Sequence, residues 1–122
     1  MLEYRYVRRV ERPHGLPVAR RQAKVRQRFG NRYLDNLYEP YGVCVELDGT
    51  SAHPEDEQWR DKRRDNANLF GGIVTFRFGF PELGEHRCES AAYVASALRV
   101  RGWLDSAHSC RRPDCPLIAA TS

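Results

Sequence analysis

The segment YGVCVELD, residues 41–48, lies between Pro40 and Gly49 and constrains the fold more than any other part of the sequence. Its apolar and polar side chains alternate, which is typical of a β-strand with one buried face. One face would carry Val43, Val45 and Leu47, and the other Cys44, Glu46 and Asp48. The segment therefore predicts a strand that presents two carboxylates opposite a hydrophobic core.

The flanking sequence predicts further elements on both sides of this strand. Apolar spacing indicates helices at residues 2–13 and 89–101, and a proline followed by acidic residues indicates the start of a charged helix at 54–69. β-Branched and aromatic residues indicate strands at 17–28, 32–38 and 73–78, with Gly30-Asn31 as the turn of a hairpin. The order is helix, three strands, helix, strand, helix. We expect an α/β fold of the α+β kind, in which helices flank a central mixed sheet.

The length suits one hydrophobic core, since a chain of 122 residues is the size of a single domain. We place this domain at residues 1–103 and interpret residues 104–122 as a polar tail with Cys and Pro, loosely packed or disordered. Apolar runs are far shorter than the roughly 20 residues of a membrane helix. Met1 is followed by charged residues that do not resemble a secretory signal. We expect a cytoplasmic protein with no membrane partner.

Four cysteines raise the question of disulfides or metal. Without an export signal, reduced thiols are expected. Cys110 and Cys115 are spaced as C-x4-C, with His108 just before them and Cys88 as a further donor. A structural Zn²⁺ site at Cys110 and Cys115 is an alternative that a single cysteine pair supports only weakly.

Charge is unevenly distributed along the chain. Residues 1–33 contain ten Arg or Lys and two Glu, whereas residues 34–65 contain nine carboxylates and four basic residues. This separation suits a protein that binds a polyanion on one surface and divalent cations on another. A solvated arginine-rich face would produce the same pattern.

Three carboxylates are candidates for a metal site. If the strands at 32–38 and 41–48 pair antiparallel, Asp35 and Glu46 lie on neighbouring strands, and Asp48 shares a face with Glu46. Carboxylates held close together need a cation between them, and Mg²⁺ or Mn²⁺ prefers such oxygen ligands. A divalent cation there would support phosphodiester hydrolysis by water. His53 follows in a loop and is a candidate to position the water or protonate the leaving group. The alternative is a solvated polar strand face.

The string Val45-Glu46-Leu47-Asp48-Gly49, followed by His53, Asp61, Arg64 and Arg77-Phe78, resembles uncharacterised endonuclease-like domains related to very short patch repair endonucleases. These belong to the PD-(D/E)XK superfamily. The resemblance covers about residues 2–103 and implies a restriction-endonuclease-like αβββαβ(α) core. It implies metal ligation by Asp35 and Glu46, with Asp48 in the place of the superfamily's lysine. It further implies supporting or DNA-binding roles for Glu3, Gln22, Arg64 and Arg77.

The resemblance implies a Mg²⁺-dependent DNA endonuclease in which Asp35, Glu46, Asp48 and His53 are catalytic. No lysine follows Glu46, and Leu34 stands where the superfamily has proline. The alternative is therefore a weak or inactive nuclease fold that binds nucleic acid or associates with an antitoxin. Similar proteins carry an amino-terminal winged-helix part before the region matched here. The DNA target and the oligomeric state stay open.

Overall fold

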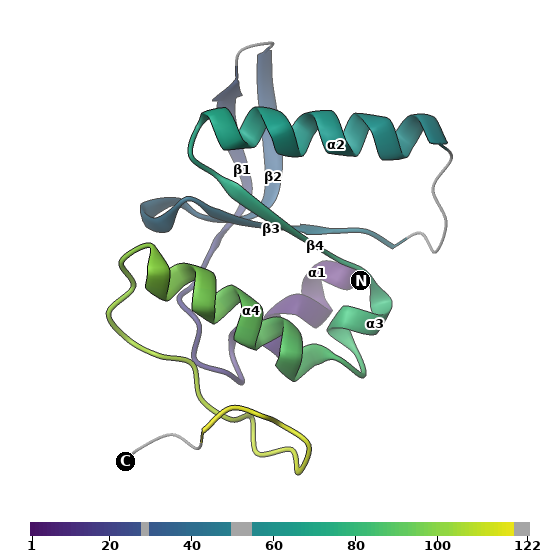
Figure 1. Ribbon diagram of the computed structural model, residues 1–122. Helices are drawn as coiled ribbons and strands as arrows, with labels where there is room; N and C mark the ends of the chain where they lie inside the picture. Colours follow the sequence, from purple (N-terminus) through teal and green to yellow (C-terminus); the bar gives the residue numbers. More distant parts are fainter. Residues whose placement is uncertain (28–29, 50–54, 119–122) are drawn as a thin grey trace.

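The computed structural model describes residues 1–27, 30–49 and 55–118, and it has the expected α+β architecture (Figure 1). A first helix precedes a four-stranded mixed sheet, and further helices pack on that sheet. The helical elements are α1 (Leu2–Arg5), which continues as the π-helical η1 (Tyr6–Glu11), the 3₁₀ turn η2 (Glu39–Tyr41), α2 (Glu55–Phe70), α3 (Phe80–Leu83) and α4 (Arg87–Val100). The strands are β1 (Arg20–Gln27), β2 (Gly30–Tyr38), β3 (Val43–Leu47) and β4 (Val74–Phe78).

The sheet has the strand order β1-β2-β3-β4. β1 and β2 form the expected antiparallel hairpin, and β2 pairs antiparallel with β3. β4 pairs parallel with β3 after the α2 crossover, so that Glu46 lies opposite Arg77. This topology confirms the pairing on which the proximity of Asp35 and Glu46 depends.

Gly42 makes the tight turn between β2 and β3 possible. It ends η2 with φ +64°, a conformation that glycine adopts without strain. A Cβ atom at this position would lie 2.6 Å from the carbonyl oxygen of Gly72. The Gly42 carbonyl also accepts a hydrogen bond from the Val74 amide at 2.9 Å. This glycine therefore joins the start of β3 to the start of β4.

The two faces of β3 bury different side chains, as the alternation predicts. Val43 and Val45 belong to the main hydrophobic core, which also contains side chains of the first helix, α3 and α4. Cys44 packs into a smaller cluster with Ala23, Leu34 and Leu37. α2 lies on this second side of the sheet (Figure 1). None of the helices in the described ranges combines the length and apolar character needed to cross a bilayer.

A buried polar network attaches the first helix to the sheet. Glu11 is 1% exposed and forms a two-point ion pair with Arg21. The Tyr38 hydroxyl donates to Glu11 at 2.9 Å and lies 2.7 Å from the Tyr6 hydroxyl. A buried carboxylate needs such a cation and such donors, because ionisation in the interior is otherwise unfavourable. Glu11 therefore has a structural role.

Two local features differ from the expectation. The short helix α3 was not anticipated; it starts with Pro81 in its first turn, where a missing amide proton costs nothing. The tail lacks helix and strand over residues 104–118, yet Ala107 and Leu117 pack against the main core. Tertiary contacts therefore order a segment whose sequence has no periodicity.

Candidate active site

Asp35 and Glu46 lie side by side where the β2–β3 ladder ends. The last residue pair of this ladder is Asn36 with Val45. Beyond it, the Asp35 amide donates to Glu46 Oε2 at 3.1 Å, and the Leu47 amide donates to Asp35 Oδ2 at 2.8 Å. Each carboxylate thus accepts a backbone hydrogen bond from the neighbouring strand, where a backbone carbonyl would otherwise continue the ladder. The structure therefore brings together two of the three residues that the sequence proposes as metal ligands.

Gln22 and Glu3 extend this pair into a row of polar side chains. Gln22 Nε2 donates to Asp35 Oδ1 and to Glu3 Oε1, both at 3.2 Å. Gln22 comes from β1 and Glu3 from α1, so three strands and one helix meet at this point. The structure therefore places Glu3 and Gln22, two of the four expected supporting or DNA-binding residues, beside the carboxylate pair.

The backbone is unusual at the same place. Gln22 has φ +49°, which is uncommon for a residue with a side chain and costs about 1–3 kcal/mol. On one side of it, Arg21 bonds to Asn36 and to the buried Glu11. On the other side, Ala23 packs with Leu34 in the second cluster. Arg21 and Asn36 thus point to one face of the sheet, whereas Ala23 and Leu34 point to the other. This change of face at Gln22 and Asp35 turns the β1–β2 hairpin relative to β3.

The environment of Glu46 favours its protonated form. Glu46 is only 8% exposed. Burial, followed by the hydrogen bond and charge of Asp35, raises its pKa to about 7, and Arg77 opposes this rise. A divalent cation between the two carboxylates would reverse the effect, because it favours both ionised forms.

Asp48 and His53 stand apart from this pair in different ways. In the described chain, Asp35, Glu46 and Asp48 do not form a group with all ligand oxygens within 4.8 Å. Asp48 instead lines a hollow of about 520 Å³ that is bounded by Arg77 and the start of α3. His53 lies outside the described residues. The catalytic roles of both residues stay predictions.

Arg77 and Arg64 both contact carboxylates of α2. Arg77 binds Asp65 through two nitrogens, at 3.0 and 2.8 Å, and Asp61 at 3.6 Å. Arg64 approaches Asp61 at 3.9 Å and is half exposed. Arg77 thus fastens α2 to β4 next to Glu46, whereas Arg64 keeps an accessible guanidinium.

A groove lined with arginines runs between α2 and the β1–β2 hairpin. It has a volume of about 580 Å³, and Val25 and Ile73 contribute apolar lining. Its basic residues are Arg26, Arg32, Arg60, Arg63 and Arg64. The Glu46 charge acts on Arg32, which links the groove electrostatically to the carboxylates. The i, i+3, i+4 spacing of the α2 arginines was the sequence signal for this surface, because these positions share one helix face.

Four arginines of the basic segment at residues 1–33 are engaged elsewhere. Arg21 is paired with Glu11, Arg20 with Glu39, and Arg8 lies over the Tyr4 ring at 5.1 Å. Arg9 contacts the Leu83 carbonyl, and Arg28 lies outside the described residues. The arginine groove is therefore the better candidate for binding phosphates.

A second potential metal site lies on the other side of the sheet. His14, Cys88, Cys110 and Cys115 form the one set in the described ranges whose ligand atoms all lie within 4.8 Å of one another. The sequence identified the three cysteines, but it pointed to His108 rather than His14. His14 follows Pro13 in a turn and carries no motif that marks it as a ligand.

Comparison with known proteins finds no matching family model, no similar curated protein and no similar solved structure. The functional argument therefore depends on the geometry of this chain. That geometry consists of a carboxylate pair, a strained strand position and an adjoining basic groove. Such a combination can hold a hard cation beside a bound phosphate.

Proposed function

We propose that this protein is a metal-dependent DNA endonuclease that uses Asp35 and Glu46 to hold Mg²⁺ or Mn²⁺. The observation that carries the proposal is the pair of hydrogen bonds that holds the two carboxylates side by side: the Asp35 amide donates to Glu46, and the Leu47 amide donates to Asp35. Glu46 is buried, and burial together with the Asp35 carboxylate raises its pKa to about 7. Glu11 is also buried, but it forms an ion pair with Arg21. A divalent cation suits two adjacent carboxylates, because it favours both ionised forms.

The donor set fits such a cation. Carboxylate oxygens are the hard ligands that Mg²⁺ prefers, and Asp35 Oδ1 and Glu46 Oε1 are not engaged by the backbone amides that hold the other two oxygens. When bound, the ion supplies activation of water and stabilisation of charge on the phosphate. Gln22 orients Asp35 through Oδ1, and the Leu47 amide orients it through Oδ2.

The groove arginines would hold the sugar-phosphate backbone beside the carboxylates. Guanidinium groups bind phosphates with two parallel hydrogen bonds. In the reaction, the oxygen of water attacks phosphorus, and the bond to one bridging oxygen breaks. The water proton is released, and the leaving oxygen takes up a proton. His53 and Asp48 remain candidates for these proton transfers.

A plasmid-nicking assay with Mg²⁺ or Mn²⁺ tests the proposal. Asp35→Asn and Glu46→Gln keep the shape of each side chain but remove a ligand charge, and we expect each to lower the rate at least about 100-fold. Glu39→Gln is the matched control, because Glu39 is an exposed carboxylate paired with Arg20. Equal rates for all four proteins would reject the assignment.

A nucleic-acid-binding module without catalysis is the second candidate. It is favoured by the placement of Asp48 outside the carboxylate pair, which leaves fewer acidic ligands than the sequence proposes. Such a module would bind DNA equally well with and without divalent metal, and it would still lose affinity in high salt. Under either candidate the partner is DNA, and the expected location is the cytoplasm.

A further inference from the structure

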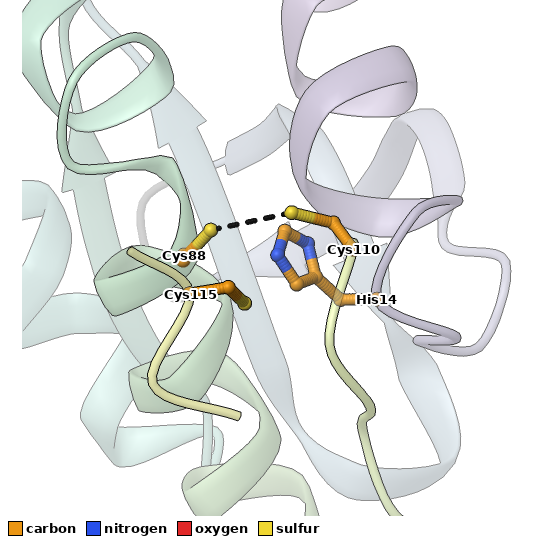
Figure 2. Close-up of side chains that lie close together, drawn as sticks. All are labelled: His14, Cys88, Cys110 and Cys115. Carbon is orange, nitrogen blue, oxygen red and sulfur yellow. Dashed lines mark hydrogen bonds between the residues drawn. The ribbon is translucent and has the colours of Figure 1, made fainter. Parts of the chain in front are cut away.

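Four potential metal ligands converge on the side of the sheet opposite α2. His14 comes from the turn after the first helix, Cys88 from the first turn of α4, and Cys110 and Cys115 from the tail (Figure 2). We propose that they form a structural Zn²⁺ site that fastens the tail to the domain. Three thiolates and one imidazole form a common tetrahedral set for structural zinc. This inference is independent of the proposed nuclease activity.

His14 is prepared to act as a ligand. Its side chain is 0% exposed, and its Nδ1 lies 2.8 Å from the Val10 carbonyl oxygen. A carbonyl only accepts hydrogen bonds, so Nδ1 carries the proton and Nε2 presents its lone pair. Nε2 is buried and has no hydrogen-bond partner in the described structure. A buried acceptor without a partner is costly, and a metal ion at the cysteines would satisfy it.

The sulfur geometry suits a tetrahedral ion. The Sγ atoms of Cys88 and Cys110 lie 3.5 Å apart. Zn–S bonds of about 2.3 Å give a tetrahedral edge of roughly 3.8 Å, so a small outward shift would admit the ion. A disulfide requires about 2.05 Å, and the four cysteines are free thiols. The present spacing is thus closer to shared metal ligation than to a covalent bond.

A cationic side chain lies beside the cysteine group. Arg87 lies close enough to Cys88 and Cys110 to interact electrostatically with both sulfur atoms. Zn²⁺ with three thiolates carries one net negative charge, which an adjacent guanidinium offsets.

The site would join the turn after the first helix, the start of α4 and the tail. The His108 amide donates to the His14 carbonyl at 2.9 Å, and its ring lies against Gly15. The tail then turns back through the Ser109 amide, which donates to the Ile118 carbonyl at 2.8 Å. A zinc ion between His14, Cys88 and the tail would hold this arrangement in place of helix or strand.

Metal content and ligand type test the proposal. The full chain is produced under reducing conditions with added zinc, then desalted and analysed for bound metal. We expect about one Zn²⁺ per chain. X-ray absorption should show three sulfur ligands at about 2.3 Å and one nitrogen at about 2.0–2.1 Å.

Matched variants separate this site from adventitious binding. Cys115→Ser and His14→Asn should lower the zinc content several-fold. Cys44→Ala removes the one cysteine outside the group, and His108→Ala removes the histidine that lies against Gly15, so both should retain zinc. If a ligand variant does not fold, the absorption spectrum of the wild-type protein still decides the ligand set.

Three results would overturn the proposal. One is a reduced wild-type protein that binds no zinc in stoichiometric amount. Another is a Cys88–Cys110 disulfide in the purified protein, detected as protected thiols by mass spectrometry after alkylation. The third is zinc bound through oxygen ligands in the absorption spectrum. None of these results would bear on the carboxylate pair, which the nicking assay tests separately.

Discussion

The carboxylate pair and the cysteine–histidine group on the other side of the sheet differ in how many metal ligands the structure brings together. His14, Cys88, Cys110 and Cys115 present four donors within 4.8 Å of one another, and the group includes a buried imidazole nitrogen without a partner. Asp35 and Glu46 present two carboxylates. The charge of Glu46 acts on Arg32, which lines the groove of about 580 Å³. The first group resembles a closed structural site, and the second an open site with room for substrate.

This difference separates two uses of metal. A closed set of soft ligands encloses its ion and contributes to folding. An incomplete set of hard ligands leaves positions for water and phosphate. We therefore expect zinc to change stability and magnesium to change activity.

Zinc removal should produce the largest change in stability. At a free Zn²⁺ concentration about 1,000-fold above its Kd, binding adds about 4 kcal/mol to the free energy of unfolding. Mg²⁺ at about tenfold above its Kd should add only about 1.4 kcal/mol. Urea unfolding at buffered metal concentrations measures both values. A urea unfolding midpoint that does not change with the zinc concentration would remove the distinction between the two sites.

Glu46→Gln should stabilise the protein at high pH. The folded pKa of Glu46, about 7, exceeds the ordinary 4.5, so the folded state binds this proton more tightly. The wild-type protein therefore loses stability as pH rises from about 4.5 to 7. The variant lacks this loss and should gain roughly 1–3 kcal/mol at pH 8 and nothing at pH 4, without divalent metal.

Glu11→Gln is the control for this pH effect. Glu11 is also buried but is paired with Arg21, so its substitution should destabilise the protein. Urea unfolding across the pH range measures both variants. A destabilised Glu46→Gln protein at pH 8 would show that Glu46 has a structural role like that of Glu11.

Gln22→Gly tests whether backbone strain serves the site. Glycine accepts φ +49° readily, so the variant should be as stable as wild type or more stable by up to about 1 kcal/mol. Nicking should fall several-fold, because Asp35 loses the amide that orients it. Lys24→Gly, at a regular position of β1, should instead lose about 0.5–1 kcal/mol and keep activity. Loss of stability in both variants would indicate an ordinary strand position.

Arg63→Gln should produce the smallest effect. Removing one phosphate contact in the groove should reduce the salt dependence of DNA binding by about one unit of log Kd per log salt. Arg99→Gln on α4 is the control, because it changes net charge equally on an element that does not line the groove. Fluorescence anisotropy across a salt series measures both. Equal slopes for the two variants would place the DNA elsewhere.

Local patterns in the sequence were sufficient for the element order and for the faces of β3. Alternation over residues 41–48 predicted which side chains enter the core, because successive strand residues point to opposite faces whatever surrounds them. The short Glu39-Pro40 connection allows the antiparallel pairing that brings Asp35 to Glu46, a condition that the structure meets. These inferences needed only backbone geometry and chain connectivity over a few residues.

Only the tertiary structure decided which distant side chains meet. His14 joins Cys88 from 74 positions along the chain, and the nearer His108 lies against Gly15 instead. Asp48 lies two residues after Glu46, just beyond β3, but it lines a separate hollow beside Arg77 and α3. α2 forms the basic groove together with the β1–β2 hairpin. Such meetings depend on how helices pack and where a strand turns, as at Gln22. Periodicity describes one element at a time, so it cannot specify contacts between elements.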